Sequence, residues 1–206
     1  MLSNLNRQFV ESATSKKGKP TDNVWESLGY DRYIRPDVAE KRKKVEKFMD
    51  QIYDDLIPFI NNCEMPHYIV PMVQKLGING FLIKDFGGPG FTNLEAGACI
   101  YEMAKRDASV ATFVLVHNAI GTAVVDKLGD DEQRKRILTE TVNMDKFICF
   151  GLTEPNNGSD ASGLKTTATK VDGGYLLTGQ KRWIGNATFA DYICVWARNP
   201  AENNNI

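Results

Sequence analysis

The chain changes its hydrophobic periodicity once, near Lys146. Before this point, apolar residues recur at steps of three, four and seven, the spacing that lines one face of a helix. After it, short apolar runs alternate with turn residues, a pattern typical of strands. We therefore predict an α+β protein in three regions: an N-terminal arm (1–30), a helical N-terminal domain (31–145) and an incomplete antiparallel β domain (146–206).

The helical region is expected to form a bundle of about five helices. The first runs from Pro36 to about Asn62 and carries a lysine-rich face, which we interpret as a solvated surface. A later helix has a capping residue at Thr92 or Asn93, and the next begins at Ser109. The helix after Ser109 is nearly continuously apolar, so we expect it to be buried on most sides.

The β region contains a predicted hairpin in which a turn at 172–174 joins two strands. Only about 60 residues follow Lys146, fewer than a closed sandwich or barrel usually needs, so we expect this domain to be incomplete. The segments with β-type patterns are, in order, 147–150, 166–171, 175–178, 183–184 and 192–196.

Composition excludes several classes of partner. The net charge of −1 provides no electrostatic attraction to nucleic acid or to a membrane surface. We see no apolar run of the roughly 20 residues that span a bilayer, and therefore predict no transmembrane segment. Four scattered cysteines and two histidines lack the clustering of a metal site, so we predict no metal and free buried thiols in a reducing compartment.

The first 24 residues are polar, and four basic residues and one acidic residue precede Pro20. A basic start with Ser and Thr is compatible with a mitochondrial targeting segment. It has no clear amphipathic stripe, however, and the sequence begins at Met1. We favour a flexible surface arm.

The loop that follows the first strand has a composition compatible with phosphate binding. Pro155 stiffens its start, and Asn156-Asn157-Gly158 permits left-handed backbone. Successive amides in such a turn can form a nest for an anion, with the Ser159 hydroxyl as a further donor. By themselves these residues favour a plain polar loop between strands.

A second segment, 179–186, contains Trp183, which can stack on a planar cofactor. A tryptophan in a predicted strand is more often part of the core. Neither segment decides between the two interpretations when it is taken alone.

Taken together, the two segments resemble the paired flavin-binding signatures of the acyl-CoA dehydrogenase and oxidase superfamily. The run 152–160 reads Leu-Thr-Glu-Pro-Asn-Asn-Gly-Ser-Asp, and 160–169 with 179–191 is most similar to plant-type short-chain acyl-CoA oxidases. The stretch 150–155 resembles glutaryl-CoA dehydrogenase. Upstream, 104–109 and 115–117 match the helical domain of the same branch, so the resemblance covers about residues 30–199.

This resemblance implies a helical N-terminal domain, a β middle domain and a C-terminal four-helix domain, of which the last is absent from this chain. The implied activity belongs to fatty acid metabolism: an oxidoreductase removes the α-proton and β-hydride of an acyl-CoA thioester, and FAD accepts the hydride. An oxidase passes the electrons to oxygen, whereas a dehydrogenase passes them to an electron-transfer flavoprotein.

The same resemblance assigns cofactor contacts to seven residues. Thr153 is expected to donate hydrogen bonds near flavin N5 and O4, and Trp183 to pack against the ring. Ser159 lies near the FAD pyrophosphate and also contacts the acyl-CoA substrate. The full set of expected FAD contacts is Phe150, Leu152, Thr153, Ser159, Trp183, Ile184 and Gly185.

No residue of this chain is assigned as catalytic, because the catalytic glutamate of the family lies in the C-terminal domain. His117 is interpreted as a core residue or pocket wall, and Glu154 and Asp160 as groups that fix a loop. We do not expect the chain alone to catalyse dehydrogenation.

Three interpretations follow, in order of preference. The chain is the N-terminal portion of an acyl-CoA flavoenzyme, one half of a split enzyme, or a non-catalytic structural subunit of a larger assembly. Expected partners are acyl-CoA and a C-terminal dehydrogenase domain in the same or another chain, within a homo-oligomer or larger assembly. The expected location is the mitochondrion, with the peroxisome as the alternative.

Overall fold

The structure is a computed structural model and describes residues 24–206. Most of the predicted arm (1–30) therefore lies outside the described residues. Its last part is folded: helix α2 (Val24–Ser27) precedes the 3-10 turn η1 (Tyr30–Tyr33). Trp25 is only 8% exposed, and its ring lies 5.6 Å from that of Tyr101 in an edge-to-face contact. These residues belong to the packed helical part.

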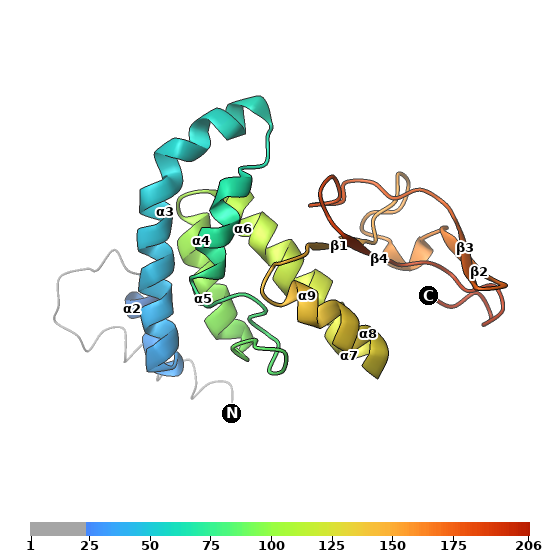
Figure 1. Ribbon diagram of the computed structural model, residues 1–206, viewed down its shortest axis with the longest axis horizontal. Coiled ribbons are helices and arrows are strands. Elements are labelled where there is room, and N and C mark those ends of the chain that lie inside the picture. The colour runs from blue at the N-terminus through green and yellow to red at the C-terminus, as the bar shows by residue number, and fades with distance from the viewer. Residues whose placement is uncertain (1–23) are drawn as a thin grey trace, which may run out of the picture.

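The helical part confirms the predicted bundle (Figure 1). Three segments join without a break into one long helix, Ala108–Leu128, and three more join into a helix from Asp131 to Thr141. The elements in chain order are α3 (Pro36–Asn62), η2 (His67–Ile69), α4 (Val70–Gln74), α5 (Asn93–Ala104), α6 (Ala108–Leu115), the π-helix η3 (Val116–Gly121), α7 (Thr122–Leu128), α8 (Asp131–Gln133), the π-helix η4 (Arg134–Leu138) and α9 (Thr139–Thr141).

Local sequence explains where these helices begin. Thr92 caps α5 as predicted: its hydroxyl accepts from the Glu95 N–H, and the Glu95 carboxylate accepts from the Thr92 N–H. Asp107 caps α6, so this helix begins at Ala108 rather than at Ser109. Asp130 forms a second capping box at the start of α8. Each cap satisfies backbone N–H groups that the helix itself leaves unpaired.

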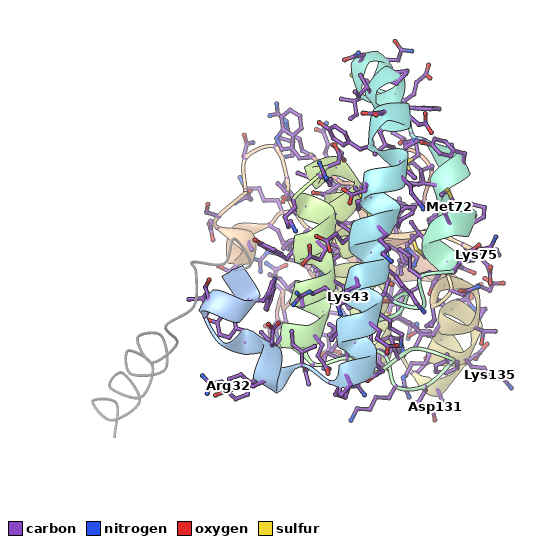
Figure 2. All side chains as sticks on the ribbon, turned by 90° about the vertical axis from the view of Figure 1, so that its left-hand side faces the viewer. Arg32, Lys43, Met72, Lys75, Asp131 and Lys135 are labelled. Carbon is purple, nitrogen blue, oxygen red and sulfur yellow. The ribbon has the colours of Figure 1, made fainter. Side chains whose placement is uncertain are left out.

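Helix α3 buries one face and exposes the other. Its buried residues include Val45, Met49 and Leu56, which are each at most 1% exposed. Figure 2 views α3 from its outer side, where Lys43 is exposed, in agreement with the predicted solvated lysine face. The apolar stripe therefore faces α5, which packs against α3.

The helix Ala108–Leu128 corrects one sequence-based expectation. Among the described residues it is the one helix that is long and apolar enough, by length and composition, to cross a membrane, with 21 residues and a mean hydropathy of 1.7. The expectation that no run reaches this length is therefore wrong. Within the fold, 56% of its most apolar stretch is buried, and Val110 and Val114 pack into the helical core. A buried core helix passes the same test, so the absence of a transmembrane segment stays a prediction.

The strands form two separate pairs. Strands β2 (Thr167–Val171) and β3 (Gly174–Thr178) form the predicted antiparallel hairpin. Strands β1 (Ile148–Gly151) and β4 (Tyr192–Val195) pair in parallel, with Ile148 opposite Tyr192, so the expectation of a wholly antiparallel domain is wrong for this pair. A parallel pair requires a long crossover connection, which the forty residues between β1 and β4 provide. The α+β class itself is confirmed.

The predicted strand at 183–184 does not form. Trp183 has φ of 61°, a left-handed conformation that does not occur within a strand. The following residues turn instead: the Ala187 N–H donates to Ile184 O and the Phe189 N–H to Asn186 O. This segment is therefore an irregular loop between β3 and β4.

The predicted buried thiols are confirmed for two cysteines only. Cys99 and Cys149 are buried, and burial raises the pKa of the Cys99 thiol to about 12. Cys194 is partly buried. Cys63 is exposed, because it ends α3 in a left-handed conformation (φ 56°) at the surface, so the prediction is wrong there.

An aromatic cluster joins the helical part to the β part. The rings of Phe113 on α6, Phe147 before β1 and Phe189 in the late loop lie within 5.6 to 5.9 Å of one another. His67 contacts the edge of Phe189 at 5.8 Å. Such edge-to-face contacts fix ring orientation as well as burying apolar area. The cluster therefore holds β1 and the late loop against the long helix.

Candidate functional site

The two segments that carry the sequence signatures lie side by side, although Leu152 and Lys181, which are bonded to each other, are 29 positions apart in the chain. The Arg182 N–H donates to the Thr153 carbonyl at 2.8 Å. The Lys181 ammonium donates to the Leu152 carbonyl at 2.9 Å. These bonds place Thr153 next to the residue that precedes Trp183.

The buried carboxylate of Glu154 stabilises the contact between these two segments. Its carboxylate is 6% exposed and accepts from the Lys165 N–H (2.7 Å), the Thr166 N–H (2.9 Å), the Thr166 hydroxyl (2.5 Å) and the Lys181 ammonium (2.9 Å). Burial pushes the pKa of Glu154 up, but these hydrogen bonds outweigh burial and lower the pKa to about 2. One anion therefore joins the loop after β1, the start of β2 and the second signature segment.

Phe150 and Leu152 share an apolar cavity of about 230 Å³ at the end of β1. Trp196 forms another wall, and its ring lies 5.8 Å from that of Phe150. The Trp196 indole N–H is buried and has no hydrogen-bond partner among the described residues. Sequence reasoning missed Trp196, because an aromatic residue at the end of a predicted strand gives no signal that distinguishes a site from a core.

Trp183 lies outside that cavity and faces the surface. Its side chain is 79% exposed, the most exposed of the large apolar side chains among the described residues. The Arg182 guanidinium lies 4.4 Å from its ring centroid, a cation–π contact that covers one face. A large exposed ring held in a strained backbone conformation is typical of a contact surface rather than of a core.

Gly185 and Ile184 continue this loop over the long helix. A Cβ atom at Gly185 would lie 3.3 Å from Val116 Cγ2, so the loop approaches the π-helix η3 closely. The Asn186 side-chain amide donates to Phe113 O at 3.1 Å and fixes the loop there. The loop therefore rests on the helical part and not on the sheet.

Ser159 is exposed, and within residues 24–206 no hydrogen bond joins its side chain to Thr153 or Trp183. The loop before it is closed by paired backbone hydrogen bonds between Glu154 and Asn157. Neither Asn157 nor its neighbours at 156 and 158 have positive φ among the described residues, so the left-handed backbone that this sequence permits does not form and the loop is a plain polar one, as these residues by themselves predict. Asp160 caps the turn η5 (Ala161–Gly163) through the Gly163 N–H, at 3.0 Å, as predicted for a loop-fixing group.

Thr153 offers hydrogen-bond donors to a ligand. Its carbonyl accepts from Arg182, but among residues 24–206 neither its N–H nor its hydroxyl has a partner. The exposed Trp183 ring belongs to the neighbouring segment. Two free donors, in a segment that lies next to the one carrying an exposed aromatic ring, fit a planar, aromatic cofactor whose edge carries acceptors, and flavin is such a group.

Comparison with protein families covers most of the chain. The family model described as "Acyl-CoA dehydrogenase, N-terminal domain" matches residues 36–145, and "Acyl-CoA dehydrogenase, middle domain" matches residues 149–206. The chain belongs to the acyl-CoA dehydrogenase family. The predicted resemblance to the N-terminal and middle domains of this family is thereby confirmed.

Two related sequences and one solved structure illustrate the similarity to other acyl-CoA dehydrogenases. A probable acyl-CoA dehydrogenase of Bacillus subtilis is 34% identical over 183 residues, which cover 84% of this chain and 31% of that protein. Mitochondrial isobutyryl-CoA dehydrogenase of Dictyostelium discoideum is 32% identical over 171 residues, 80% of this chain and 41% of that protein. The solved glutaryl-CoA dehydrogenase of Mycobacterium smegmatis, in complex with FADH2, superposes with a TM-score of 0.77 at 27% identity, over 82% of this chain and 44% of that one.

The chain thus spans less than half the length of each of these acyl-CoA dehydrogenases. The solved M. smegmatis structure confirms the predicted likeness to glutaryl-CoA dehydrogenase. The relatives named above are dehydrogenases, and the likeness to plant-type oxidases stays a prediction.

We predict that Glu154→Gln lowers the free energy of unfolding at pH 7 and weakens its dependence on pH. Because folding lowers the pKa of Glu154 from 4.5 to about 2, its stabilisation is present above about pH 4.5 and is lost as the pH falls towards 2. The difference between wild type and variant should shrink by up to about 3 kcal/mol over that range. Urea unfolding at a series of pH values measures it.

Glu202→Gln is the matched control. Glu202 is exposed and its carboxylate forms no ion pair within residues 24–206, so its replacement should leave the pH dependence of unfolding unchanged. If Glu154→Gln behaves like this control, the buried carboxylate does not stabilise the site.

Proposed function

We propose that the chain supplies the N-terminal and middle domains of an FAD-dependent acyl-CoA dehydrogenase, which introduces an α,β double bond into an acyl-CoA thioester. The observation that carries this proposal is that the segment of Thr153, whose N–H and hydroxyl are free, lies beside the segment that carries the exposed Trp183. Membership of the family and the FADH2-bound M. smegmatis relative support it.

Bound FAD supplies the hydride acceptor of this reaction. The Thr153 N–H and hydroxyl would donate to the N5 and O4 edge of the ring, where negative charge develops, and so would stabilise the reduced form. Trp183 would pack against the ring, and the backbone of Ile184 and Gly185 would lie alongside it. Phe150 and Leu152 would offer apolar surface to the ring.

Ser159, which is exposed, is assigned to the pyrophosphate of FAD and to the acyl-CoA chain. An exposed hydroxyl at the rim of the loop is free to bind an extended ligand that leaves the ring and crosses the surface. This assignment rests on the family resemblance.

We assign no catalytic base to this chain. Glu154 is the carboxylate nearest to Thr153 in sequence, but four hydrogen bonds hold it as an anion and its low pKa makes it a poor proton acceptor. The base is a glutamate in a C-terminal helical domain, in the same or another chain, within an oligomer. We propose a mitochondrial location, because several relatives are named as mitochondrial, with the peroxisome as the alternative.

We predict that the complete protein, purified from its source and kept free of oxygen, loses its flavin absorbance when butyryl-CoA is added. Removal of the α-proton and β-hydride reduces the ring, and visible absorption measures this directly. Free coenzyme A, which has no acyl chain, is the control and should leave the spectrum unchanged. A flavin that no acyl-CoA of any chain length reduces would favour the non-catalytic subunit instead.

We predict that Trp183→Ala weakens FAD binding about tenfold in the complete protein, because it removes the ring that packs against the cofactor. Tyr175→Ala is the matched control: Tyr175 is a 58% exposed aromatic residue on β3, outside the site. FAD titration followed by flavin fluorescence measures both variants. Equal affinities in Trp183→Ala and Tyr175→Ala would contradict the placement of the ring.

A further inference from the structure

His117 connects the long helix to the first strand by two hydrogen bonds. It is fully buried, and it lies in the π-helical segment η3. Its Nε2 lies 2.7 Å from the carbonyl oxygen of Thr141, at the end of α9. Its Nδ1 lies 3.2 Å from the backbone nitrogen of Ile148, the first residue of β1.

These partners determine the protonation state of the ring. The Ile148 N–H can only donate, so Nδ1 must be unprotonated and accept. The Thr141 carbonyl can only accept, so Nε2 carries the hydrogen. Burial lowers the pKa of His117 to about 4, against the opposing effect of the hydrogen bond to Thr141, and keeps the imidazole neutral.

The π-helical geometry explains why this histidine points towards β1. A π-helix has a wider turn than an α-helix and often occurs at functional sites. Here it directs two consecutive polar side chains inwards: His117 to Thr141 and Ile148, and Asn118 to the Gly80 N–H at 2.5 Å. The same segment supports Gly185 through Val116. Segment η3 therefore contacts both parts of the candidate flavin site.

The position of Ile148 determines where the later residues of β1 lie, and these residues belong to the candidate site. Phe150 lies within this four-residue strand, and Leu152 and Thr153 follow it directly. The parallel pairing with β4 keeps the strand straight, so a shift at its first residue moves its end by a similar amount. His117 itself contacts none of the residues assigned to the flavin.

We propose that His117 is a positioning residue: its acceptor bond to the Ile148 N–H sets where β1 lies, and thereby where Phe150, Leu152 and Thr153 meet the flavin. This inference rests on the proposed function of the site. It goes beyond the role of a core histidine, because it assigns separate roles to the two ring nitrogens. The Nδ1 bond positions the strand, whereas the Nε2 bond only stabilises the helix end.

Two conservative substitutions separate these roles. In His117→Asn the side-chain oxygen takes the place of Nδ1 and can accept from Ile148, but the donor to Thr141 is lost. In His117→Gln the amide nitrogen takes the place of Nε2 and can donate to Thr141, but the acceptor for Ile148 is lost. His117→Phe keeps an aromatic ring and loses both bonds.

The control for general destabilisation is Thr122→Val. The Thr122 hydroxyl is fully buried and donates to Asn118 O at 2.7 Å within the same helix, away from β1. Its removal leaves a buried group without its partner, as the His117 variants do. It should lower stability without changing the position of the strand.

The test uses the complete protein and two measurements: FAD affinity, and hydrogen exchange of the β1 amides. We expect His117→Gln and His117→Phe to weaken FAD binding at least about fivefold and to speed exchange at Ile148. His117→Asn and Thr122→Val should keep both properties within about twofold of wild type, although both proteins unfold more easily.

Other outcomes overturn the inference in distinguishable ways. If all four variants weaken FAD binding in proportion to their loss of stability, His117 is a structural core residue. If His117→Gln keeps wild-type affinity and exchange, the Nδ1 bond does not position the strand. If the wild-type protein binds no FAD, the proposed function fails and this inference fails with it.

Discussion

The candidate site depends on one buried carboxylate. Glu154 accepts four hydrogen bonds from two other parts of the chain, residues 165–166 and Lys181, and the Lys181 ammonium neutralises its charge. An uncompensated buried carboxylate costs several kcal/mol, so these partners must be in place for the fold to form. The consequence is geometric: the donors that satisfy Glu154 also bring the two signature segments together.

The position of the site depends also on the junction between the helices and the strands. The Phe113, Phe147 and Phe189 rings pack where the long helix, the start of β1 and the late loop meet. Asp191 accepts from the Phe147 N–H, and the Tyr192 hydroxyl donates to Glu140 on the helical side. In Figure 1 the strands β1 and β4 accordingly lie directly beside the helices. Glu154 joins the two segments of the candidate site to each other, and this junction packs the site against the helical part.

Local sequence patterns predict most of the helical part and the β hairpin. The stripe on α3, the Thr92 cap and the hairpin turn each depend on residues close together in the chain, where periodicity and capping rules apply. The pairing of β1 with β4 depends on contacts between residues about forty positions apart. The irregular backbone at Trp183 depends on a strained conformation. Hydrophobic periodicity reports neither of these. Both of these expectations were wrong for that reason.

The site shows the same division. The family resemblance singled out Thr153 and Trp183, and the structure places their segments side by side. Their roles towards a flavin stay proposals. Glu154 is predicted to fix a loop, but the sequence does not indicate its bond to Lys181, since a lysine between two predicted strands carries no sign of its partner. Trp196 was missed altogether.

The central claim is that segments 152–154 and 181–183 together form a face that holds FAD. The most direct measurement is the visible absorption spectrum of the complete protein, purified from its source without added flavin, together with its intact mass and that of any tightly bound partner. We predict a flavin spectrum with about one FAD per copy of this chain, released on denaturation. A colourless protein that takes up no FAD when the cofactor is added would contradict the claim.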